Sequence, residues 1–96
     1  MPTMTGRDAL AQMLIAEGVE YVFGNPGTSE SPLLNVLQDF PRLKYVQALQ
    51  EGTAVGMADG YARASGRPAF ANLHIAGGLA NGLSALYNAY RGGTPL

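Results

Sequence analysis

Three short segments of the chain carry groups that could do chemistry. In residues 24–29, two glycines and a proline form a rigid turn that can lie close to a ligand, and Thr28 and Ser29 add hydroxyl groups. Residues 50–51 bring a carboxyl group, that of Glu51. Residues 74–78 begin with the titratable imidazole of His74 and continue into glycines.

Each segment also has a plain structural interpretation. Residues 24–29 are equally compatible with a tight turn that caps a helix. Glu51 is a carboxylate at a helix N-terminus, where it contributes about 0.3–1 kcal/mol to helix stability. A functional role for Glu51 requires a place at the mouth of an apolar cleft, where desolvation would raise its pKa. A lone histidine after a strand is more often structural than catalytic, although His74 is followed by the N–H groups of a helix start.

Helical and strand patterns alternate along the chain and predict where these segments lie. This order predicts an α/β fold, a parallel sheet with helices on both faces. Ligands bind beyond the carboxyl ends of the strands in such sheets, so the three segments are expected to meet at one edge. The predicted strands are residues 21–23, 44–49 and 69–75, and the predicted helices are residues 8–16, a stretch from Ser29 or Ser31, residues 52–65, and Gly77 to about Tyr90.

Composition excludes several classes of function. The net charge is −1 and no basic run occurs, so nothing favours a nucleic acid or an anionic membrane as partner. Zero cysteines and one histidine exclude disulfides and the usual zinc sites. Neither a dinucleotide-binding nor a P-loop motif occurs, which disfavours a nucleotide-binding domain. No signal peptide or long apolar stretch is visible, so a cytoplasmic location is expected.

The end of the chain predicts that the fold is incomplete. Residues 92–96 would lead into a fourth strand, and only 14% of the residues are charged, which suggests that other protein covers much of the surface. Residues 1–96 are therefore interpreted as one partial domain. Asp59 lies between Ala58 and Gly60 inside a predicted helix rather than after a strand, so it is not interpreted as a metal ligand.

Three motifs together resemble a known family. They are Val22-Phe23-Gly24-Asn25-Pro26-Gly27, then Ala48-Leu49-Gln50-Glu51 with Ala58-Asp59-Gly60-Tyr61-Ala62, then Asn72-Leu73-His74 with Gly77 and Asn81. In this order and spacing they resemble the pyrimidine-binding domain of thiamine-diphosphate-dependent 2-oxo-acid decarboxylases and acetolactate-synthase-like enzymes. The Gly-Asn-Pro-Gly and Asn-Leu-His motifs are most similar to the benzoylformate decarboxylase branch.

The resemblance implies a fold, a cofactor and partners. It implies a flavodoxin-like domain that binds the pyrimidine of thiamine diphosphate. A separate domain, absent from this chain, would hold the diphosphate and Mg²⁺ and would come from a second subunit of a dimer or tetramer. The substrate would be a 2-oxo acid. The chain alone is therefore expected neither to bind the cofactor tightly nor to turn over.

The resemblance also implies residue roles. Glu51 would hydrogen-bond a ring nitrogen of the cofactor as a neutral carboxyl, and His74 would exchange protons with the substrate-derived adduct. Thr28 occupies the position of a substrate-binding serine, and its extra methyl puts aryl specificity in question. Asn81 is also expected at the cofactor. The cleft would be lined by Gly24, Asn25, Pro26 and Gly27.

The function expected from this resemblance is a non-oxidative decarboxylase of 2-oxo acids. One alternative is an acetolactate-synthase-like carboligase, although such enzymes usually lack a histidine at the position of His74. A second alternative is a non-catalytic subunit-contact domain with the same fold. Substitution of Glu51 by glutamine separates the enzymes from the non-catalytic domain.

Overall fold

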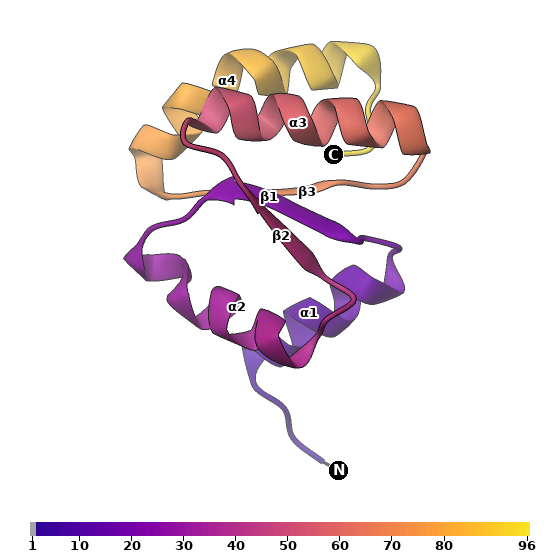
Figure 1. Ribbon diagram of the computed structural model, residues 1–96, viewed down its shortest axis with the longest axis vertical. Coiled ribbons are helices and arrows are strands. Elements are labelled where there is room, and N and C mark those ends of the chain that lie inside the picture. Colours follow the sequence, from indigo (N-terminus) through magenta and orange to yellow (C-terminus); the bar gives the residue numbers. More distant parts are fainter. Residues whose placement is uncertain (1) are drawn as a thin grey trace.

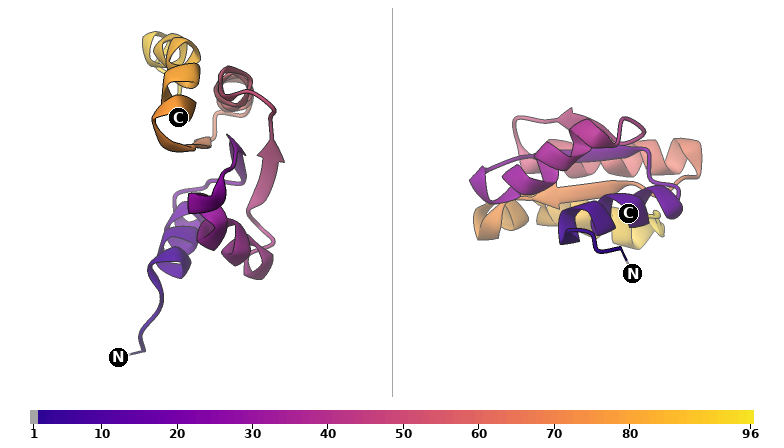
Figure 2. Two further views of the ribbon diagram at one scale, coloured as in Figure 1. Left: turned by 90° about the vertical axis from the view of Figure 1, so that its left-hand side faces the viewer. Right: turned by 90° about the horizontal axis from the view of Figure 1, so that it is seen from below.

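A computed structural model describes residues 2–96 (Figure 1). The elements are α1 (Gly6–Ala16), β1 (Tyr21–Asn25), the 3₁₀ turn η1 (Thr28–Glu30), α2 (Ser31–Val36), the 3₁₀ turn η2 (Leu37–Asp39), β2 (Lys44–Gln47), α3 (Glu51–Ser65), β3 (Phe70–Leu73) and α4 (Ile75–Gly92). The strands form one parallel sheet in the order β2-β1-β3. Helices α1 and α2 cover one face, while α3 covers the other with α4 beside it (Figures 1 and 2). The predicted fold class is confirmed.

The register of the sheet brings the carboxyl ends of the strands to one edge. Gly24 near the end of β1 pairs with Gln47 of β2 and with Asn72 of β3. The backbone N–H of Ala48 donates to the carbonyl of Gly24 at 2.9 Å, which continues the ladder one residue beyond β2. The three segments singled out in the sequence therefore leave the sheet at the same edge, as a parallel arrangement predicts.

Apolar side chains form a separate core on each face of the sheet. Burial of these side chains is the main favourable contribution to folding. The α1–α2 face is closed by Ala11, Leu14, Val19, Val36 and Leu43. The α3 face is closed by Phe23, Ala58, Ala62 and Ala69. The small alanines on this second face let α3 lie close to the strands.

Two buried glycines let α4 approach α3. A Cβ on Gly82 would lie 3.0 Å from Cδ1 of Leu73 and 3.2 Å from Cγ2 of Val55. A Cβ on Gly78 would lie 3.5 Å from Cγ of Glu51. At Gly82 these distances are tighter than ordinary contacts, so a larger side chain there would press α4 outward, whereas at Gly78 a Cβ would make an ordinary contact. Gly82 thus sets how closely α4 packs on α3, the helix that begins at Glu51.

Side chains and a glycine define the ends of α1 and α3. The hydroxyl of Thr5 accepts the N–H of Asp8 at 3.2 Å and caps α1. The side-chain oxygen of Gln50 accepts the N–H of Thr53 at 3.1 Å and caps α3. Gly66 ends α3 with φ at 71°, in the left-handed region that favours glycine. Glu51 is thereby placed in the first turn of a well-defined helix.

The first two strands differ in length from the sequence prediction. β1 extends to Asn25 rather than ending at Phe23. β2 ends at Gln47, and Leu49, which was predicted to lie in this strand, is 90% exposed. The chain turns at Leu49 because Gln50 already caps α3. The apolar side chain of Leu49 therefore led to a prediction of β2 that was too long.

The third strand is shorter and the last helix longer than predicted. β3 ends at Leu73 instead of Ile75, and α4 begins at Ile75 instead of Gly77. His74 is consequently the N-cap of α4 rather than a strand residue. Ile75 has a φ of 52°, which is rare for a β-branched residue. This conformation lets the chain reverse directly from β3 into α4.

The segment after α4 returns to the sheet beside β3. The N–H of Ala69 donates to the carbonyl of Pro95 at 2.9 Å, a contact of the kind that joins neighbouring strands. Within residues 2–96 no fourth strand is formed, so the predicted lead into a fourth strand is seen only as this one contact.

No helix in this part of the chain has both the length and the apolar character needed to cross a membrane.

Three tyrosines lie on the helices: Tyr61 on α3, and Tyr87 and Tyr90 on α4. Tyr61 packs against the sheet, with its ring centroid 5.1 Å from that of Tyr21 and 5.8 Å from that of Phe23. Tyr87 and Tyr90 are 61% and 79% exposed on α4. Only Tyr61 therefore contributes to the core.

Candidate functional site

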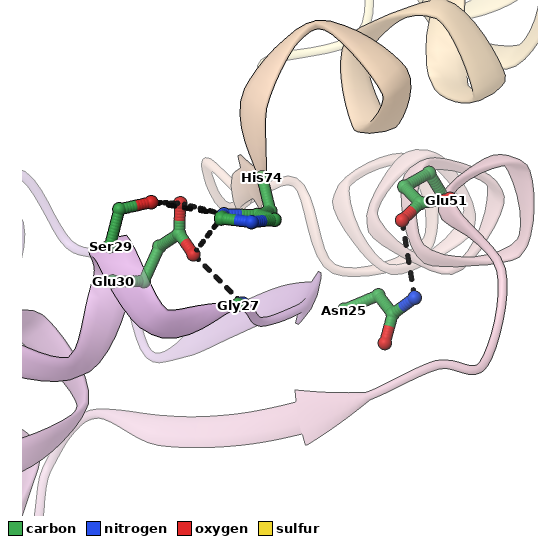
Figure 3. Close-up of polar contacts among 6 residues, drawn as sticks. All are labelled: Asn25, Gly27, Ser29, Glu30, Glu51 and His74. Carbon is green, nitrogen blue, oxygen red and sulfur yellow. Dashed lines mark hydrogen bonds and ion pairs between the residues drawn. The ribbon is translucent and has the colours of Figure 1, made fainter.

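Glu51 begins α3 at the carboxyl edge of the sheet, and its side chain is buried, with 8% of the residue exposed. The amide nitrogen of Asn25 donates to Oε2 of Glu51 at 3.1 Å (Figure 3). The amide nitrogen of Asn81 donates to Oε1 at 3.0 Å. β1, α3 and α4 thus meet at one carboxyl group. These three predicted site residues are brought together although they lie far apart in the sequence.

The pKa of Glu51 is lowered from its ordinary value. The amide of Asn81 is the largest cause, and the helix backbone, the amide of Asn25 and the nearby ring of His74 act in the same direction. Burial raises the pKa but is outweighed. The expectation that desolvation would raise the pKa of Glu51 is therefore wrong for this chain by itself. Donors that stabilise the carboxylate face it from three sides, which the sequence did not reveal.

Gly24 allows a close approach of three strands. A Cβ on Gly24 would lie 2.7 Å from the hydroxyl of Tyr45 and 2.6 Å from the carbonyl oxygen of Asn72. The Tyr45 hydroxyl is buried without a hydrogen-bond partner among residues 2–96. Burial, with the charge of Glu30 as a second cause, raises the pKa of Tyr45. Packing alone is therefore enough to require a glycine at position 24.

The chain crosses the edge of the sheet at Pro26 and Gly27 and then enters η1. Glu30 closes this turn, because its Oε2 accepts the N–H of Gly27 at 2.8 Å. Thr28 is exposed on the turn, and its side chain makes no hydrogen bond within the described residues. The Thr28 hydroxyl is thus available at the edge where the predicted substrate would lie.

His74 lies against the same turn. Its Nδ1 is 2.8 Å from Oε2 and 3.1 Å from Oε1 of Glu30, and 3.0 Å from the hydroxyl of Ser29 (Figure 3). The imidazole covers Gly27 so closely that a Cβ there would overlap with ring atoms. His74 and Gly27 were predicted from the sequence to be site residues, whereas Glu30 was given no role. Glu30 follows Gly27 by three residues, which is the spacing of a capping box. This spacing is a sequence signal that could have identified Glu30.

Two polar side chains, Glu51 and His74, therefore lie along one stretch of backbone, residues 25–30 (Figure 3). Asn25 binds the carboxylate of Glu51 at the start of this stretch, and Glu30 binds the ring of His74 at its end. A buried carboxyl and a partly exposed imidazole at one sheet edge can exchange protons with a ligand bound between them.

Asp59 takes part in a structural network instead of a site. Its Oδ1 accepts the hydroxyl of Thr94 at 2.6 Å and Nε of Arg63 at 2.8 Å. These contacts, the Thr94 hydroxyl first, lower the pKa of Asp59 despite some burial. The network ties the segment after α4 to α3. No group of three histidine or acidic residues within residues 2–96 is arranged to hold a metal ion.

Residues 4–96 match the family model described as thiamine pyrophosphate enzyme, N-terminal TPP binding domain. The chain belongs to this family. The resemblance found in the sequence motifs is thereby confirmed. Thiamine pyrophosphate is the same compound as thiamine diphosphate, so the cofactor class is that of the family.

Relatives within the thiamine pyrophosphate family include more than one kind of enzyme. The chain is 50% identical over 93 residues to benzoylformate decarboxylase of Pseudomonas aeruginosa, an alignment that covers 96% of the chain. It is 47% identical over 93 residues to the putative acetolactate synthase large subunit IlvX of Mycobacterium tuberculosis, covering 97% of the chain. The alignments span 17% and 18% of these two relatives. The chain thus matches only a small part of their length.

Solved structures show the same architecture. A thiamine diphosphate-dependent 4-hydroxybenzoylformate decarboxylase of Rhodococcus jostii superposes with a TM-score of 0.90 at 39% identity, covering 97% of the chain and 17% of the other protein. Benzoylformate decarboxylase of Polynucleobacter necessarius superposes with a TM-score of 0.87 at 37% identity, covering 98% of the chain and 17% of the other protein. The fold is that of the family's N-terminal domain.

The residues at the sheet edge fit an aminopyrimidine in type and position. Such a ring needs a partner for a ring nitrogen and an acceptor for its amino group. Glu51 supplies a carboxyl, and the side-chain oxygen of Asn25 is left to accept because its nitrogen donates to Glu51. The lowered pKa of Glu51 favours the charged form, whereas donation to a ring nitrogen requires a proton. A flat, weakly polar ring over the small exposed part of Glu51 would complete its burial, and burial acts to raise the pKa of this carboxyl.

Proposed function

We propose that this chain is the pyrimidine-binding part of a thiamine diphosphate-dependent decarboxylase of 2-oxo acids. The observation that carries the proposal is the placement of Glu51 against Asn25 and of His74 against Gly27, two residues apart along the edge of the sheet (Figure 3). We propose that one ligand reaches both side chains. Identity of 50% to a benzoylformate decarboxylase over nearly the whole chain supports the decarboxylase branch. Residues 1–96 would form one partial domain of the complete enzyme.

Each residue has a role in this proposal. When bound, the cofactor supplies the electron sink that accepts the electrons released with carbon dioxide. Glu51 holds a proton at a ring nitrogen, and Asn25 and Asn81 keep its carboxyl in one orientation. His74 moves a proton to or from the reacting end of the substrate through Nε2. The Thr28 hydroxyl binds the substrate carboxylate, and Gly24, Pro26 and Gly27 form the backbone wall of the cleft.

The rest of the active site would come from outside this chain. Mg²⁺, which would hold the diphosphate, takes carboxylate oxygens as ligands, and residues 2–96 present no cluster of acidic side chains. We therefore place these ligands on another domain, supplied by a second subunit of a homodimer or tetramer. The exposed Tyr87 and Tyr90 on α4 support such a contact.

The test is turnover of 2-oxo acids by the assembled protein, supplied with thiamine diphosphate and Mg²⁺. We expect aldehyde and carbon dioxide to form, with an aryl-substituted acid among the substrates. Glu51→Gln is expected to reduce kcat by about 10²–10⁴-fold, the contribution of a positioned acid or base. Glu17→Gln, an exposed matched control at the end of α1, is expected to leave kcat unchanged. Equal activity of the two variants would favour a non-catalytic subunit-contact domain.

An acetolactate-synthase-like carboligase is the second candidate, because the chain is 47% identical to a putative acetolactate synthase subunit. A carboligase requires two carbonyl substrates and keeps its activity in His74→Ala. A decarboxylase acts on one 2-oxo acid and loses activity in the same variant. Measuring decarboxylation and carboligation with the wild type and with His74→Ala therefore separates the two candidates.

A further inference from the structure

The contact between His74 and Glu30 joins two side chains that are 44 residues apart and partly buried. Nδ1 of His74 lies 2.8 Å from Oε2 and 3.1 Å from Oε1 of Glu30. Only 27% of the His74 side chain and 12% of the Glu30 side chain are exposed. Neither oxygen of the carboxyl can therefore turn to water without breaking this contact.

Glu30 is held as a carboxylate in this position. Burial raises its pKa, but the N–H of Gly27, the ring of His74 and the hydroxyl of Ser29 outweigh burial, so the pKa lies below the ordinary value. Oε2 accepts the Gly27 N–H at 2.8 Å, and the Ser29 hydroxyl donates to Oε1 at 3.2 Å. The carboxylate is thus fixed from the turn side and presents lone pairs to the imidazole.

A carboxylate at this distance determines which ring nitrogen carries the proton. A lone pair on Nδ1 would face two negatively charged oxygens, so Nδ1 carries hydrogen and donates to Glu30. In the neutral ring, Nε2 then has the lone pair. Nε2 lies over Gly27 and makes no hydrogen bond with any of residues 2–96. It is the nitrogen that a ligand at the edge of the sheet can reach.

We propose that Glu30 is a positioning residue for His74: it fixes the Nδ1–H tautomer and directs Nε2 across Gly27 towards the substrate. The catalytic part of this inference rests on the proposed function, whereas the tautomer part does not. Glu30 itself touches neither the substrate nor the cofactor. Its absence would leave a histidine at the same place in the sequence but with either nitrogen protonated and the ring free to rotate.

The tautomer can be measured directly because His74 is the single histidine of the chain. In a chain labelled with ¹⁵N-histidine, long-range ¹H–¹⁵N correlations identify which nitrogen of the neutral ring carries hydrogen. We expect Nδ1–H in the wild type and loss of this preference in Glu30→Ala. Glu30→Gln keeps one acceptor oxygen, so its preference for Nδ1–H should lie between those of the wild type and Glu30→Ala. An Nε2–H ring in the wild type, or the same tautomer in all three proteins, would overturn the proposal.

A double-mutant cycle in the assembled, cofactor-loaded enzyme tests the kinetic consequence. Glu30→Ala should reduce kcat by about 10–100-fold with a smaller change in KM, as loss of an outer partner of a functional histidine does. In a His74→Ala background the same substitution should change kcat by less than about twofold, because the group on which it acts is gone. Equal losses in the two backgrounds would mean a merely structural role and would contradict the proposal.

The two measurements separate this inference from the proposed function. If the enzyme proves to be no decarboxylase, the tautomer of His74 still confirms or refutes the contact with Glu30. If the decarboxylase is active but Glu30→Ala retains both the tautomer and kcat, only the role of Glu30 fails. Glu30→Gln preserves an acceptor for the Gly27 N–H, so the test does not depend on the alanine variant folding.

Discussion

The amide nitrogen of Asn81 lies 3.0 Å from Oε1 of Glu51, so the first turn of α3 is joined to α4 by a hydrogen bond. This bond is the largest cause of the lowered pKa of Glu51, whereas the bond from Asn25 is a smaller one. The two asparagines therefore both help to lower the pKa of the carboxyl that is central to the proposed site, Asn81 more than Asn25.

Asn81→Ala is accordingly expected to raise the pKa of Glu51 towards its ordinary value. Asn25→Ala should raise it less, and the double variant should raise it most. Titration of the ¹³C-labelled carboxyl by NMR measures these changes. Asn88→Ala, on the same helix but without a side-chain contact to Glu51, is the matched control and should leave the titration unchanged. A larger effect of Asn25→Ala than of Asn81→Ala would contradict the assignment.

Gly27→Ala is expected to displace the imidazole of His74, because a Cβ at this position overlaps with the ring. The backbone at Gly27 has φ −120° and ψ −170°, which alanine also adopts, so the fold should be retained. A ring moved by about 1 Å would reduce kcat by about 10²-fold.

The control for this variant is Gly56→Ala in α3, where a Cβ meets no atom within 4 Å. It should leave kcat unchanged and stabilise the protein by about 0.5–1 kcal/mol, the usual gain from replacing glycine inside a helix. Thermal unfolding and steady-state kinetics of both variants provide the comparison. Unchanged turnover in Gly27→Ala would show that the position of the ring is unimportant.

Thr28→Ser should alter the preference among 2-oxo acids. The substitution keeps the hydroxyl and removes one methyl at the exposed edge of the site. One methyl in a binding pocket is worth about 1–3 kcal/mol, or about 10–200-fold in relative kcat/KM. We expect the ratio of kcat/KM for an aryl substrate over a small aliphatic one to rise. Thr53→Ser, which lies outside the site, should not change this ratio.

Thr94→Val is expected to make the chain more sensitive to acid. The Thr94 hydroxyl is the main cause of the lowered pKa of Asp59, and the segment after α4 is held by this contact. A lowered carboxyl pKa adds stability above its unfolded-state pKa of about 4, and this stability is lost as the pH falls through the folded-state value.

Removing the hydroxyl raises the folded-state pKa of Asp59, so acid unfolding should begin at a higher pH. Circular dichroism followed from pH 7 downwards measures the midpoint. Thr3→Val, at an exposed position near the N-terminus, should keep the wild-type midpoint. An identical midpoint for both variants would show that the Asp59 contact contributes nothing.

The chain alone is expected to bind thiamine diphosphate weakly at most. Its described residues offer partners for the pyrimidine but no metal cluster for the diphosphate. Calorimetric titration with thiamine diphosphate and Mg²⁺ should give no tight complex, whereas the assembled protein should bind in a Mg²⁺-dependent way. Tight, Mg²⁺-dependent binding by residues 1–96 would contradict the division of the site between domains.

The sequence by itself determined the order of the elements and the edge at which the site lies. Alternating apolar patterns gave a parallel sheet, and in a parallel sheet all carboxyl ends meet at one edge. Glu51, His74 and residues 24–29 follow three such strands, so their convergence was predictable. The ends of the strands were not predictable. Leu49 and Ile75 are apolar enough for a strand, but where each strand ends depends on where the next helix is capped.

Only the tertiary structure decided the chemistry of individual groups. Glu51 is stabilised as a carboxylate because Asn25 and Asn81 reach it across distances of 26 and 30 residues in sequence. His74 has a fixed partner because η1 brings the carboxylate of Glu30 to Nδ1 of its ring. Hydrogen bonds between side chains on different elements act over only about 3 Å. Helix spacing of that accuracy comes from packing, here from the buried glycines of α4, and no residue pattern along the chain encodes it alone.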